Sequence, residues 1–269
     1  MLSTRHEEYR QLNSGLPFVL GADIERSRYN LSNENNWHEN LEIQLCTKGS
    51  GFVFLEGKRY QFCKNDIAVV NSNVIHYTGT DSELIYDCLI IGTDFCKQID
   101  FSVEYLSFEA IVRDEAAFNK ICELKELYFD FSAPYRNAKL NKLLLEILLL
   151  LAEKHSTPKV ETSEKSKSYE RVKHAVLYIR DNYQRKITLD EIAKAVFCDK
   201  FTLCKDFKKH TGQTVFENLN NLRCIKAIDF IEKGYTVSEA ASMCGFDNLS
   251  FFTKTFKKHI GTLPSSYKK

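Results

Sequence analysis

The sequence predicts an α+β multidomain protein, in which an N-terminal β-barrel with supporting helices precedes an all-α domain containing two helix–turn–helix units. Three observations lead to this prediction. Short strand-like segments separated by turns occupy the first third of the chain, and apolar helical segments follow them. A helix–turn–helix pattern then occurs twice near the end. With 269 residues, of which 43% are hydrophobic and 27% charged, the chain is long enough for about two domains with separate cores.

The strand-like segments lie between about residues 18 and 91. Residues 41–45 and 51–55 are apolar or alternate between apolar and polar, and the sequence EGK at 56–58 is typical of a hairpin turn. Short strands at this spacing predict a β-sandwich or a small barrel.

Two helices are predicted between about residues 114 and 154. Residues 115–131 carry apolar side chains at helical spacing, whereas residues 135–153 are apolar on nearly all sides. A single packing face does not require so many leucines. This second helix is therefore expected either to lie between the barrel and its helical neighbour or to form a dimer interface. We assign residues 1–155 to this first domain.

Composition and charge both change near residue 169. Residues 156–168 are mostly small or polar and include one proline, which predicts a linker. Residues 1–169 hold 19 Lys and Arg against 25 Asp and Glu, a net charge of −6, whereas residues 170–269 hold 18 against 11, a net charge of +7. An acidic half joined to a basic half indicates a polyanionic partner for the second domain, residues 169–269.

The basic domain contains an internal repeat. The sequence FKKHTG at 207–212 recurs as FKKHIG at 256–261, and TLDEIA at 188–193 matches TVSEAA at 236–241. Each of the latter segments begins with a Thr that is followed three residues later by Glu, which is the pattern of a capping box at a helix start. A duplicated unit is far more specific than any single short motif.

Helix-capping residues define the second helix of each unit. Asp199 is expected to cap this helix in the first unit, and Asp247 or Asn248 in the second. Gly212 and Gly261 follow the last helical residues, as is typical of helix ends. Each unit is therefore predicted to fold as helix, turn, helix.

Two helix–turn–helix units on a rigid helical spacer, residues 215–233, fit the geometry of DNA. Each second helix can enter a major groove, and two successive grooves on one face of a duplex lie ~34 Å apart. Lysines neutralise phosphates while polar side chains contact base edges. The alternative is a helical bundle whose lysines are only solvated. The exposed faces expected to contact DNA carry Phe201, Cys204, Lys205 and Lys208 in the first unit and Ser250, Thr253, Lys254 and Lys257 in the second.

The closing part of the chain is highly patterned. It contains GF at 245–246, SFF at 250–252, FKK at 256–258, and then Gly261, Pro264 and Tyr267. With these residues, the basic domain resembles the DNA-binding domain of AraC/XylS-type transcription regulators. The resemblance implies promoter DNA as a partner, homodimerisation, and activation through contact with RNA polymerase. It also implies base-reading positions at Phe201, Cys204 and Lys205 and at Leu249, Ser250 and Lys254.

The N-terminal half is similar to the cupin-like sensor domain of the same family, through HENLE at 38–42 and NSNVIH at 71–76. In metal-binding cupins the positions of His38, Glu42 and His76 are ligands, with a further histidine where this chain has Asn36. Two histidines and a carboxylate can bind a divalent ion, but the missing ligand favours a small-molecule pocket. We therefore expect no metal and no other cofactor. The residues expected to bind a small-molecule effector are Trp37, His38, Glu42, His76 and Tyr77.

Together these features predict a sequence-specific DNA-binding transcription regulator, an activator that responds to a small molecule bound by its N-terminal domain. We expect no enzymatic activity, because no GxSxG, HExxH or P-loop motif occurs. The alternative is a metal-dependent cupin enzyme with an appended helical domain, which requires metal on the two histidines and Glu42 plus an open coordination position.

The sequence also predicts a cytoplasmic protein without a membrane partner. The N-terminus has no apolar core of a signal peptide, and the longest apolar run, at 143–152, is about half of the ~20 residues that a membrane span needs. Nine cysteines without a CxxC pair are typical of reduced thiols in that compartment.

Overall fold

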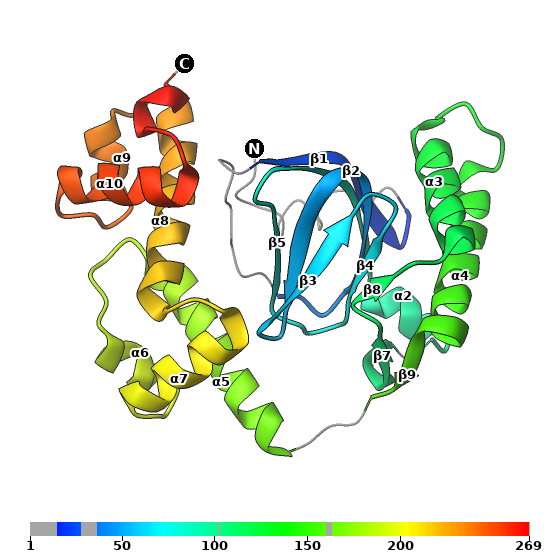
Figure 1. Cartoon of the computed structure of the whole chain (residues 1–269), viewed down its shortest axis with the longest axis horizontal. Helices are drawn as coiled ribbons and strands as arrows, with labels where there is room; N and C mark the ends of the chain where they lie inside the picture. The colour runs from blue at the N-terminus through cyan, green and yellow to red at the C-terminus, as the bar shows by residue number, and fades with distance from the viewer. Residues whose placement is uncertain (1–14, 28–36, 102, 160–162, 269) are drawn as a thin grey trace.

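The computed structural model describes residues 15–27, 37–101, 103–159 and 163–268 (Figure 1). A closed antiparallel β-structure forms the N-terminal part, with a helical hairpin against one side and the C-terminal helices on the other. Its strands are β1 (Phe18–Ser27), β2 (Leu41–Leu55), β3 (Lys58–Cys63), β4 (Ile67–Val70), β5 (His76–Gly79), β6 (Glu83–Ile91) and β8 (Ile111–Val112). The structure thus confirms the predicted α+β class, with its sheet domain and its helical domain.

Strand β2 organises the barrel. Its first half pairs with β4 and β6, and its second half pairs with β3 and β5, all antiparallel. The register of β2 against β6 shifts between Cys46 and Lys48, where the strand bends from one side to the other. Along the main path the strand order is β1-β6-β2-β4-β8.

Alternation along β2 separates two cores. Leu41, Ile43 and Leu45 pack on the outer side against the helical hairpin, whereas Cys46 belongs to the inner core. Because successive strand residues point to opposite faces, Glu42 and Gln44 share the inner face with Cys46. Both are almost completely buried, so polar side chains lie inside the barrel.

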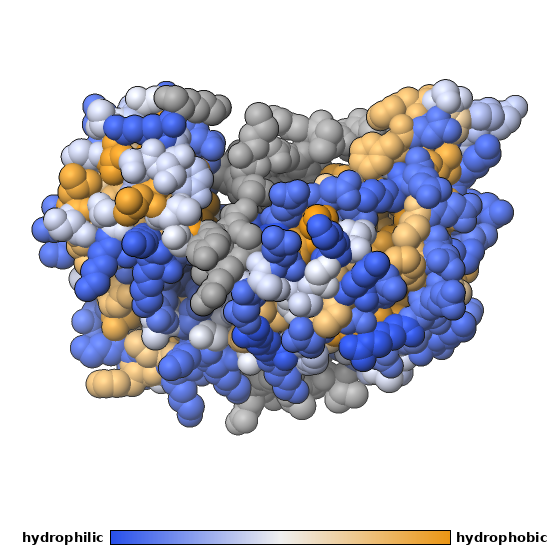
Figure 2. Space-filling model, turned by 45° about the horizontal axis from the view of Figure 1, so that its top comes forward, coloured by the Kyte–Doolittle hydropathy of each residue, from blue (hydrophilic) through white to orange (hydrophobic). Residues whose placement is uncertain are grey.

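The hairpin of α3 (Glu115–Phe129) and α4 (Arg136–His155) covers the outer core. Helix α4 buries a broad leucine-rich face in the core that it shares with α3 and the outer side of the sheet, which accounts for most of its apolar residues. Hydrophobic surface is visible over the hairpin in Figure 2. Phe131, in the loop of the hairpin, is 81% exposed, and Leu149, on α4, is 52% exposed.

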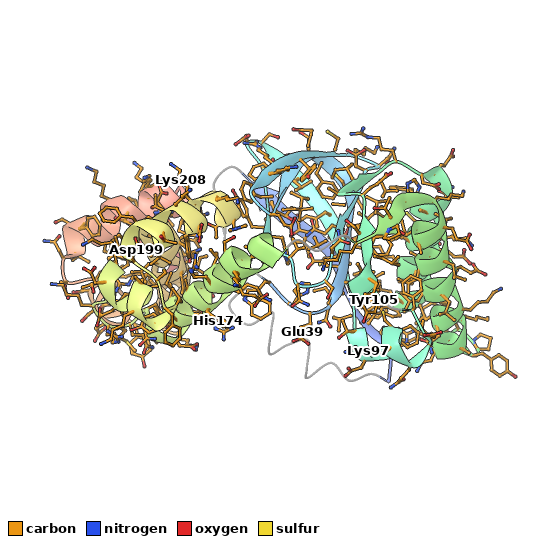
Figure 3. All side chains as sticks on the ribbon, turned by 90° about the horizontal axis from the view of Figure 1, so that it is seen from below. Glu39, Lys97, Tyr105, His174, Asp199 and Lys208 are labelled. Carbon is orange, nitrogen blue, oxygen red and sulfur yellow. The ribbon has the colours of Figure 1, made fainter. Side chains whose placement is uncertain are left out.

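Several short elements were not foreseen. They are α2 (Thr93–Gln98), the 3-10 turn η1 (Val103–Tyr105), β7 (Leu106–Phe108), β9 (Ser156–Pro158) and also β8, which extends the sheet beyond the barrel predicted at about 18–91. Figure 3 marks Lys97 and Tyr105 in this region. Strand β9 and the start of helix α5 (Ser163–Asn182) both fall within residues 156–168, the segment predicted as a linker. Composition alone misses them, because β9 is held by pairing with the distant β7 and α5 by apolar residues further along the helix.

The remaining helices form the two predicted units. They are α6 (Leu189–Ala195) and α7 (Lys200–Thr211), the spacer α8 (Val215–Glu232), α9 (Val237–Met243) and α10 (Leu249–Ile260), followed by η2 (Pro264–Tyr267). Helix α8 contributes Val215 and Leu219 to the core of the first unit, and Ile225 and Ile231 to that of the second. No helix within the described ranges is long and apolar enough to cross a membrane.

Candidate functional site

The two units repeat the same backbone hydrogen bonds around their turns. In the first, the Cys198 N–H donates to the Ala193 carbonyl, and in the second the Phe246 N–H donates to the Ala241 carbonyl, both at 3.0 Å. The residue before each of these donors has a positive φ. The capping boxes predicted at the starts of α6 and α9 are both present.

Side chains cap the second helices as the sequence predicted. The Asp199 carboxylate accepts from the backbone N–H groups of Phe201 and Thr202 at the start of α7. The Asn248 side chain accepts from the Phe251 N–H at the start of α10, which settles the choice between Asp247 and Asn248. Gly212 and Gly261 end the helices with positive φ.

Helices α7 and α10 present the expected residues at the surface. Their opposite faces are buried through Leu203 and Phe207, and through Phe252 and Phe256. Figure 3 marks Asp199 and Lys208 on the first of these units. The exposed residues are Phe201, Cys204, Lys205, Lys208, Leu249, Ser250, Lys254 and Lys257, and Thr253 is half-buried. The exposed faces of the two helices therefore combine lysines with polar and apolar side chains.

A shallow open groove runs along the exposed face of α10. It is lined by Leu249, Ser250, Thr253, Lys254, Lys257 and Leu263. Five of these six residues were expected from the sequence to contact DNA. Leu263 was not, because it lies beyond the helix and reaches the groove only through the fold of the chain after Gly261.

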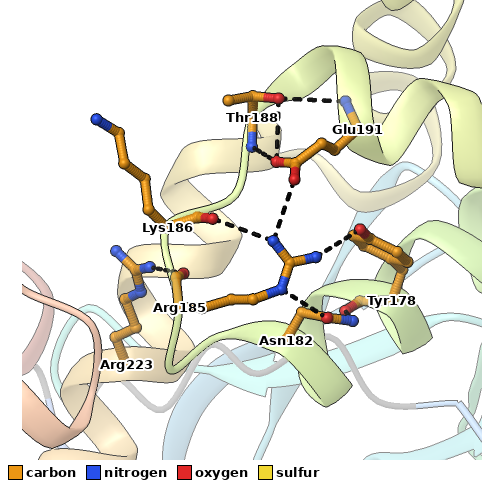
Figure 4. Close-up of polar contacts among 7 residues, drawn as sticks. All are labelled: Tyr178, Asn182, Arg185, Lys186, Thr188, Glu191 and Arg223. Atoms are coloured by element: carbon orange, nitrogen blue, oxygen red, sulfur yellow. Dashed lines mark hydrogen bonds and ion pairs between the residues drawn. The ribbon is translucent and has the colours of Figure 1, made fainter.

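Arg223 of the spacer helix contacts residues of both units, and Figure 4 shows its hydrogen bond to the Arg185 carbonyl. Its guanidinium donates to the carbonyls of Tyr183 at 2.7 Å and Arg185 at 2.8 Å, in the connection between α5 and α6. The same guanidinium lies 5.6 Å from the centre of the Phe246 ring in the second unit. Burial lowers the pKa of Arg223. This arginine therefore bridges the two units through α8.

Arg185 secures the start of the first unit in the same region (Figure 4). Its side chain donates to the Tyr178 hydroxyl at 2.7 Å and to the Asn182 side chain at 3.0 Å. It also forms an ion pair with Glu191, the capping-box residue of α6, at 3.1 Å. Helix α6 is thereby attached to the end of α5.

A second candidate site lies inside the barrel, where Glu42 of β2, His76 of β5 and His38, just before β2, come together. The Nε2 atoms of His38 and His76 lie 2.9 and 3.3 Å from the same carboxylate oxygen, Glu42 Oε2. The side chains are 13%, 3% and 5% exposed for His38, Glu42 and His76. Burial by itself raises the pKa of Glu42, but the charge of His76 and the hydrogen bonds from both histidines outweigh it and hold that pKa well below its usual value.

Trp37 and Tyr77 make other contacts. The Tyr77 ring stacks on Phe54 with centroids 4.9 Å apart, and it follows His76 on β5, so its side chain points to the opposite face of the strand. Burial raises the pKa of Tyr77. The Trp37 ring lies under the Lys173 ammonium of α5 at 4.3 Å. The structure thus brings together three of the five residues expected to bind an effector.

The barrel and the first unit touch through α5 and α7. The Tyr169 hydroxyl of α5 donates to the Asn73 carbonyl at 2.9 Å and accepts from the Ile75 N–H. Burial raises the pKa of Tyr169, which keeps this hydroxyl protonated as a donor. A Cβ atom at Gly57, in the β2–β3 turn, would lie only 2.0 Å from the Lys209 carbonyl oxygen near the end of α7. Sequence patterns gave no signal for this contact.

Comparison with known proteins agrees with both halves of the structure. A family model described as an AraC-like ligand binding domain matches residues 22–164, and one described as a helix-turn-helix domain matches residues 192–269. The chain is 26% identical over 237 residues to the lactose operon transcription activator of Staphylococcus xylosus, covering 84% of this chain and 82% of that protein. It is 21% identical over 262 residues to an uncharacterized HTH-type transcriptional regulator, YdeC, of Bacillus subtilis, covering 87% and 85%.

Among solved structures, ToxT from Vibrio cholerae has a similar fold. The TM-score is 0.53 at 16% sequence identity, and the match covers 93% of this chain and 97% of that one. The similarity therefore extends over both the barrel and the two helix–turn–helix units.

Proposed function

Because the chain belongs to the AraC family of transcription regulators, we propose that it binds promoter DNA through α7 and α10 and activates transcription in response to an effector bound by its barrel. One observation carries the DNA-binding part of this proposal. Two helix–turn–helix units with exposed, basic second helices are held on one spacer and bridged by Arg223. Two such helices can enter successive major grooves on one face of a duplex.

The exposed residues of α7 and α10 divide by chemistry. Lys208 and Lys257 lie towards the C-terminal ends of the helices and neutralise phosphates. The polar or charged residues nearer the N-terminal ends contact base edges, and these are Lys205, Ser250, Thr253 and Lys254. The apolar or weakly polar residues Phe201, Cys204 and Leu249 suit contact with thymine methyl groups.

For the sensing part, we place the effector site at His38, Glu42 and His76, the three of the five expected residues that the structure brings together. Residues 1–155 then form the sensor domain and 169–269 the DNA-binding domain, joined by 156–168. The contact of Tyr169 with Asn73 and Ile75 supports a route between them, because it links the segment that carries His76 to α5. An effector changes DNA affinity only if it binds two arrangements of the domains unequally.

Helix α4 supports a homodimer. Leu149 is exposed and Leu145 half-buried, and Asn141 on the same side keeps a buried side-chain oxygen without a partner among the described residues. A Leu149→Glu variant should sediment as a monomer where the parent protein sediments as a dimer, and Lys139→Ala, exposed on the same helix, should not change the mass. Equal masses for the parent and Leu149→Glu would exclude α4 as the interface.

An activator contacts RNA polymerase at the promoter, so we propose RNA polymerase as a further partner of this chain. Because promoter DNA lies in the cytoplasm of a bacterial cell, we also propose that the protein acts there. The relatives are transcription regulators, and we propose a regulatory rather than a catalytic role for this chain as well. A catalytic role would require turnover at the buried histidine–carboxylate cluster.

The DNA-binding proposal is tested on the full chain. Duplexes selected from a randomised pool provide the binding site, and titrations then compare the parent protein with Lys254→Ala. Loss of one base contact weakens binding by about 1–3 kcal/mol, which corresponds to roughly 5- to 150-fold. Lys97→Ala, an exposed lysine on α2 (Figure 3), is the matched control for lost positive charge and should bind as the parent does. Unchanged affinity in Lys254→Ala would contradict the assignment of α10.

A further inference from the structure

The spacing of His38, Glu42 and His76 matches that of metal ligands. The three ligating atoms lie within 4.8 Å of one another. Nitrogen and oxygen ligands about 2.0–2.1 Å from a tetrahedral ion lie ~3.3 Å apart. The distances from the two Nε2 atoms to Glu42 Oε2, 2.9 and 3.3 Å, are already near that value.

The second nitrogen of each imidazole is held by a backbone carbonyl. His38 Nδ1 lies 3.1 Å from the Asn40 oxygen, and His76 Nδ1 lies 2.8 Å from the Val74 oxygen. A carbonyl only accepts, so each Nδ1 donates and each Nε2 is turned towards Glu42. Metal-ligating histidines are oriented in this way, because the outer hydrogen bond selects the tautomer that leaves the other nitrogen for the metal.

The two oxygens of Glu42 have different neighbours. Oε1 accepts from Gln44 Nε2 at 2.6 Å and from Cys88 Sγ at 3.0 Å, whereas Oε2 faces the two histidines. Gln44 is itself held by the Thr78 hydroxyl at 2.7 Å. The carboxylate is thus fixed through one oxygen, and the other is directed at the point where the imidazoles converge. Ligating carboxylates are commonly supported by such outer hydrogen bonds.

We propose that His38, Glu42 and His76 bind a divalent first-row transition-metal ion such as Zn²⁺, and that this ion is the effector of the regulator. The second clause rests on the proposed function. Two imidazoles and one carboxylate select this class over Mg²⁺ and Ca²⁺, which prefer oxygen ligands alone. The proposal departs from the expectation of no metal, which depended on Asn36. That position lies outside the described residues, and the geometry of the other three supplies a site without it.

Both histidines adjoin the contact between barrel and α5. The Asn73 N–H donates to the His38 carbonyl at 2.9 Å, and the Asn73 carbonyl accepts from Tyr169. On the other side, Ile75 donates to Tyr169 and directly precedes His76. An ion that draws the two imidazoles together therefore acts on both hydrogen bonds of Tyr169. This gives metal binding a short physical route to the first helix–turn–helix unit.

The site is tested with the chelator-treated full chain, titrated with Co²⁺ and read by the visible absorption of the bound ion. We expect one ion per chain, competition by Zn²⁺, and binding weakened by at least about 10- to 100-fold in His38→Ala and His76→Ala. His174→Ala, exposed on α5 (Figure 3), is the control and should bind as the parent. Glu42→Gln, nearly isosteric, gives the same test if a histidine variant fails to fold. A near-ultraviolet thiolate band would assign the ion to cysteines, and equal binding in all variants would show that the ion binds elsewhere. Either result would overturn the proposal.

A second measurement compares DNA affinity with Zn²⁺ and with chelator, for the parent and His76→Ala. We expect a change of about fivefold or more in the parent and none in the variant. Cobalt binding without any change in DNA affinity would overturn the effector role. A protein that binds cobalt but no DNA under either condition would refute the proposed function and leave the metal site standing.

Discussion

The two helix–turn–helix units have the same backbone conformation around the turn but different residues at its left-handed position. The first has Phe197, with φ of 55°, and the second has Gly245, with φ of 80°. Phe197 is 95% exposed. At Gly245 a Cβ atom would lie 2.7 Å from the Tyr183 carbonyl oxygen and 2.8 Å from the Arg223 guanidinium. The second turn is thus a packing site between the units, whereas the first is open.

The opposite ends of the second helices differ as well. Gly212, at the end of α7, lies so close to the barrel that a Cβ there would be 2.5 Å from the Phe54 ring. At the end of α10, the Phe256 ring instead contacts Tyr267 of η2, with centroids 5.9 Å apart. The first unit therefore contacts the N-terminal barrel directly, whereas the second is positioned by the spacer helix and Arg223.

The largest expected effect is at Gly245. Gly245→Ala both strains a residue with positive φ and forces the Cβ into the Tyr183 carbonyl and Arg223, so we expect the free energy of unfolding to fall by about 3 kcal/mol or more. Gly234→Ala is the matched control, because Gly234 has φ of 95° but no atom within 4 Å of the added Cβ. It should lose about 1–2 kcal/mol from backbone strain alone. Urea unfolding measures both, and equal losses would show that packing at Gly245 is unimportant.

Arg223→Met should have the next largest effect. It removes the hydrogen bonds to the carbonyls of Tyr183 and Arg185 while keeping an apolar stem, so we expect a loss of about 2–3 kcal/mol in urea unfolding. Affinity for a duplex with both half-sites should fall more than affinity for a single half-site, because the units lose their bridge. Arg180→Met, exposed at the end of α5, controls for lost charge. A uniform loss on both duplexes would argue against a bridging role.

Phe197→Gly tests the open turn and should change stability in the opposite direction. Relief of the left-handed conformation gains about 1–2 kcal/mol, and the extra freedom of glycine in the unfolded chain offsets about 0.5–1 kcal/mol of it. We therefore expect a net stabilisation of up to about 1.5 kcal/mol, seen as a higher urea midpoint. A lower midpoint would mean that the exposed ring makes stabilising contacts.

Local patterns predicted most of the helical domain. Thr188 and Thr236 with their capping glutamates, the caps of α7 and α10, and the spacer helix were all read correctly, because capping chemistry operates within four residues of the chain. The capping box of Thr214 and Glu217 at the start of α8 has the same signature and was missed. Whether the exposed residues of these helices contact DNA stays a prediction.

Long-range contacts set the limit of sequence reasoning. Three contacts join residues that lie 40 to 96 positions apart in the chain. They are the pairing of β7 with β9, the hydrogen bond from Arg223 to Tyr183, and the hydrogen bond from Tyr169 to Asn73. No periodicity in the sequence indicates them. His38, Glu42 and His76 could be proposed as neighbours only through resemblance. The sequence did not show that one carboxylate oxygen is reserved for the two histidines, because that depends on Gln44 and Cys88.

The smallest expected effect is a difference in how the capping boxes of α6 and α9 make the stability of the fold depend on pH. Hydrogen bonds from Thr188 and from Arg185 lower the pKa of Glu191, whereas Thr236 alone supplies those that lower the pKa of Glu239. A pKa lowered in the folded state contributes stability above the unfolded value, about 4.3, which is lost as pH falls through the folded pKa.

We therefore expect the drop in Tm between about pH 5 and pH 3 to be smaller in Glu191→Gln and Glu239→Gln than in the parent. The reduction should be greater for Glu191→Gln, since its carboxylate also holds Arg185 at 3.1 Å. Arg185→Met in the Glu191→Gln background should then leave the pH dependence unchanged. An equal reduction in the two glutamine variants would mean that the ion pair adds nothing to the first unit, and that the units differ only at their turns and at the sensor contact.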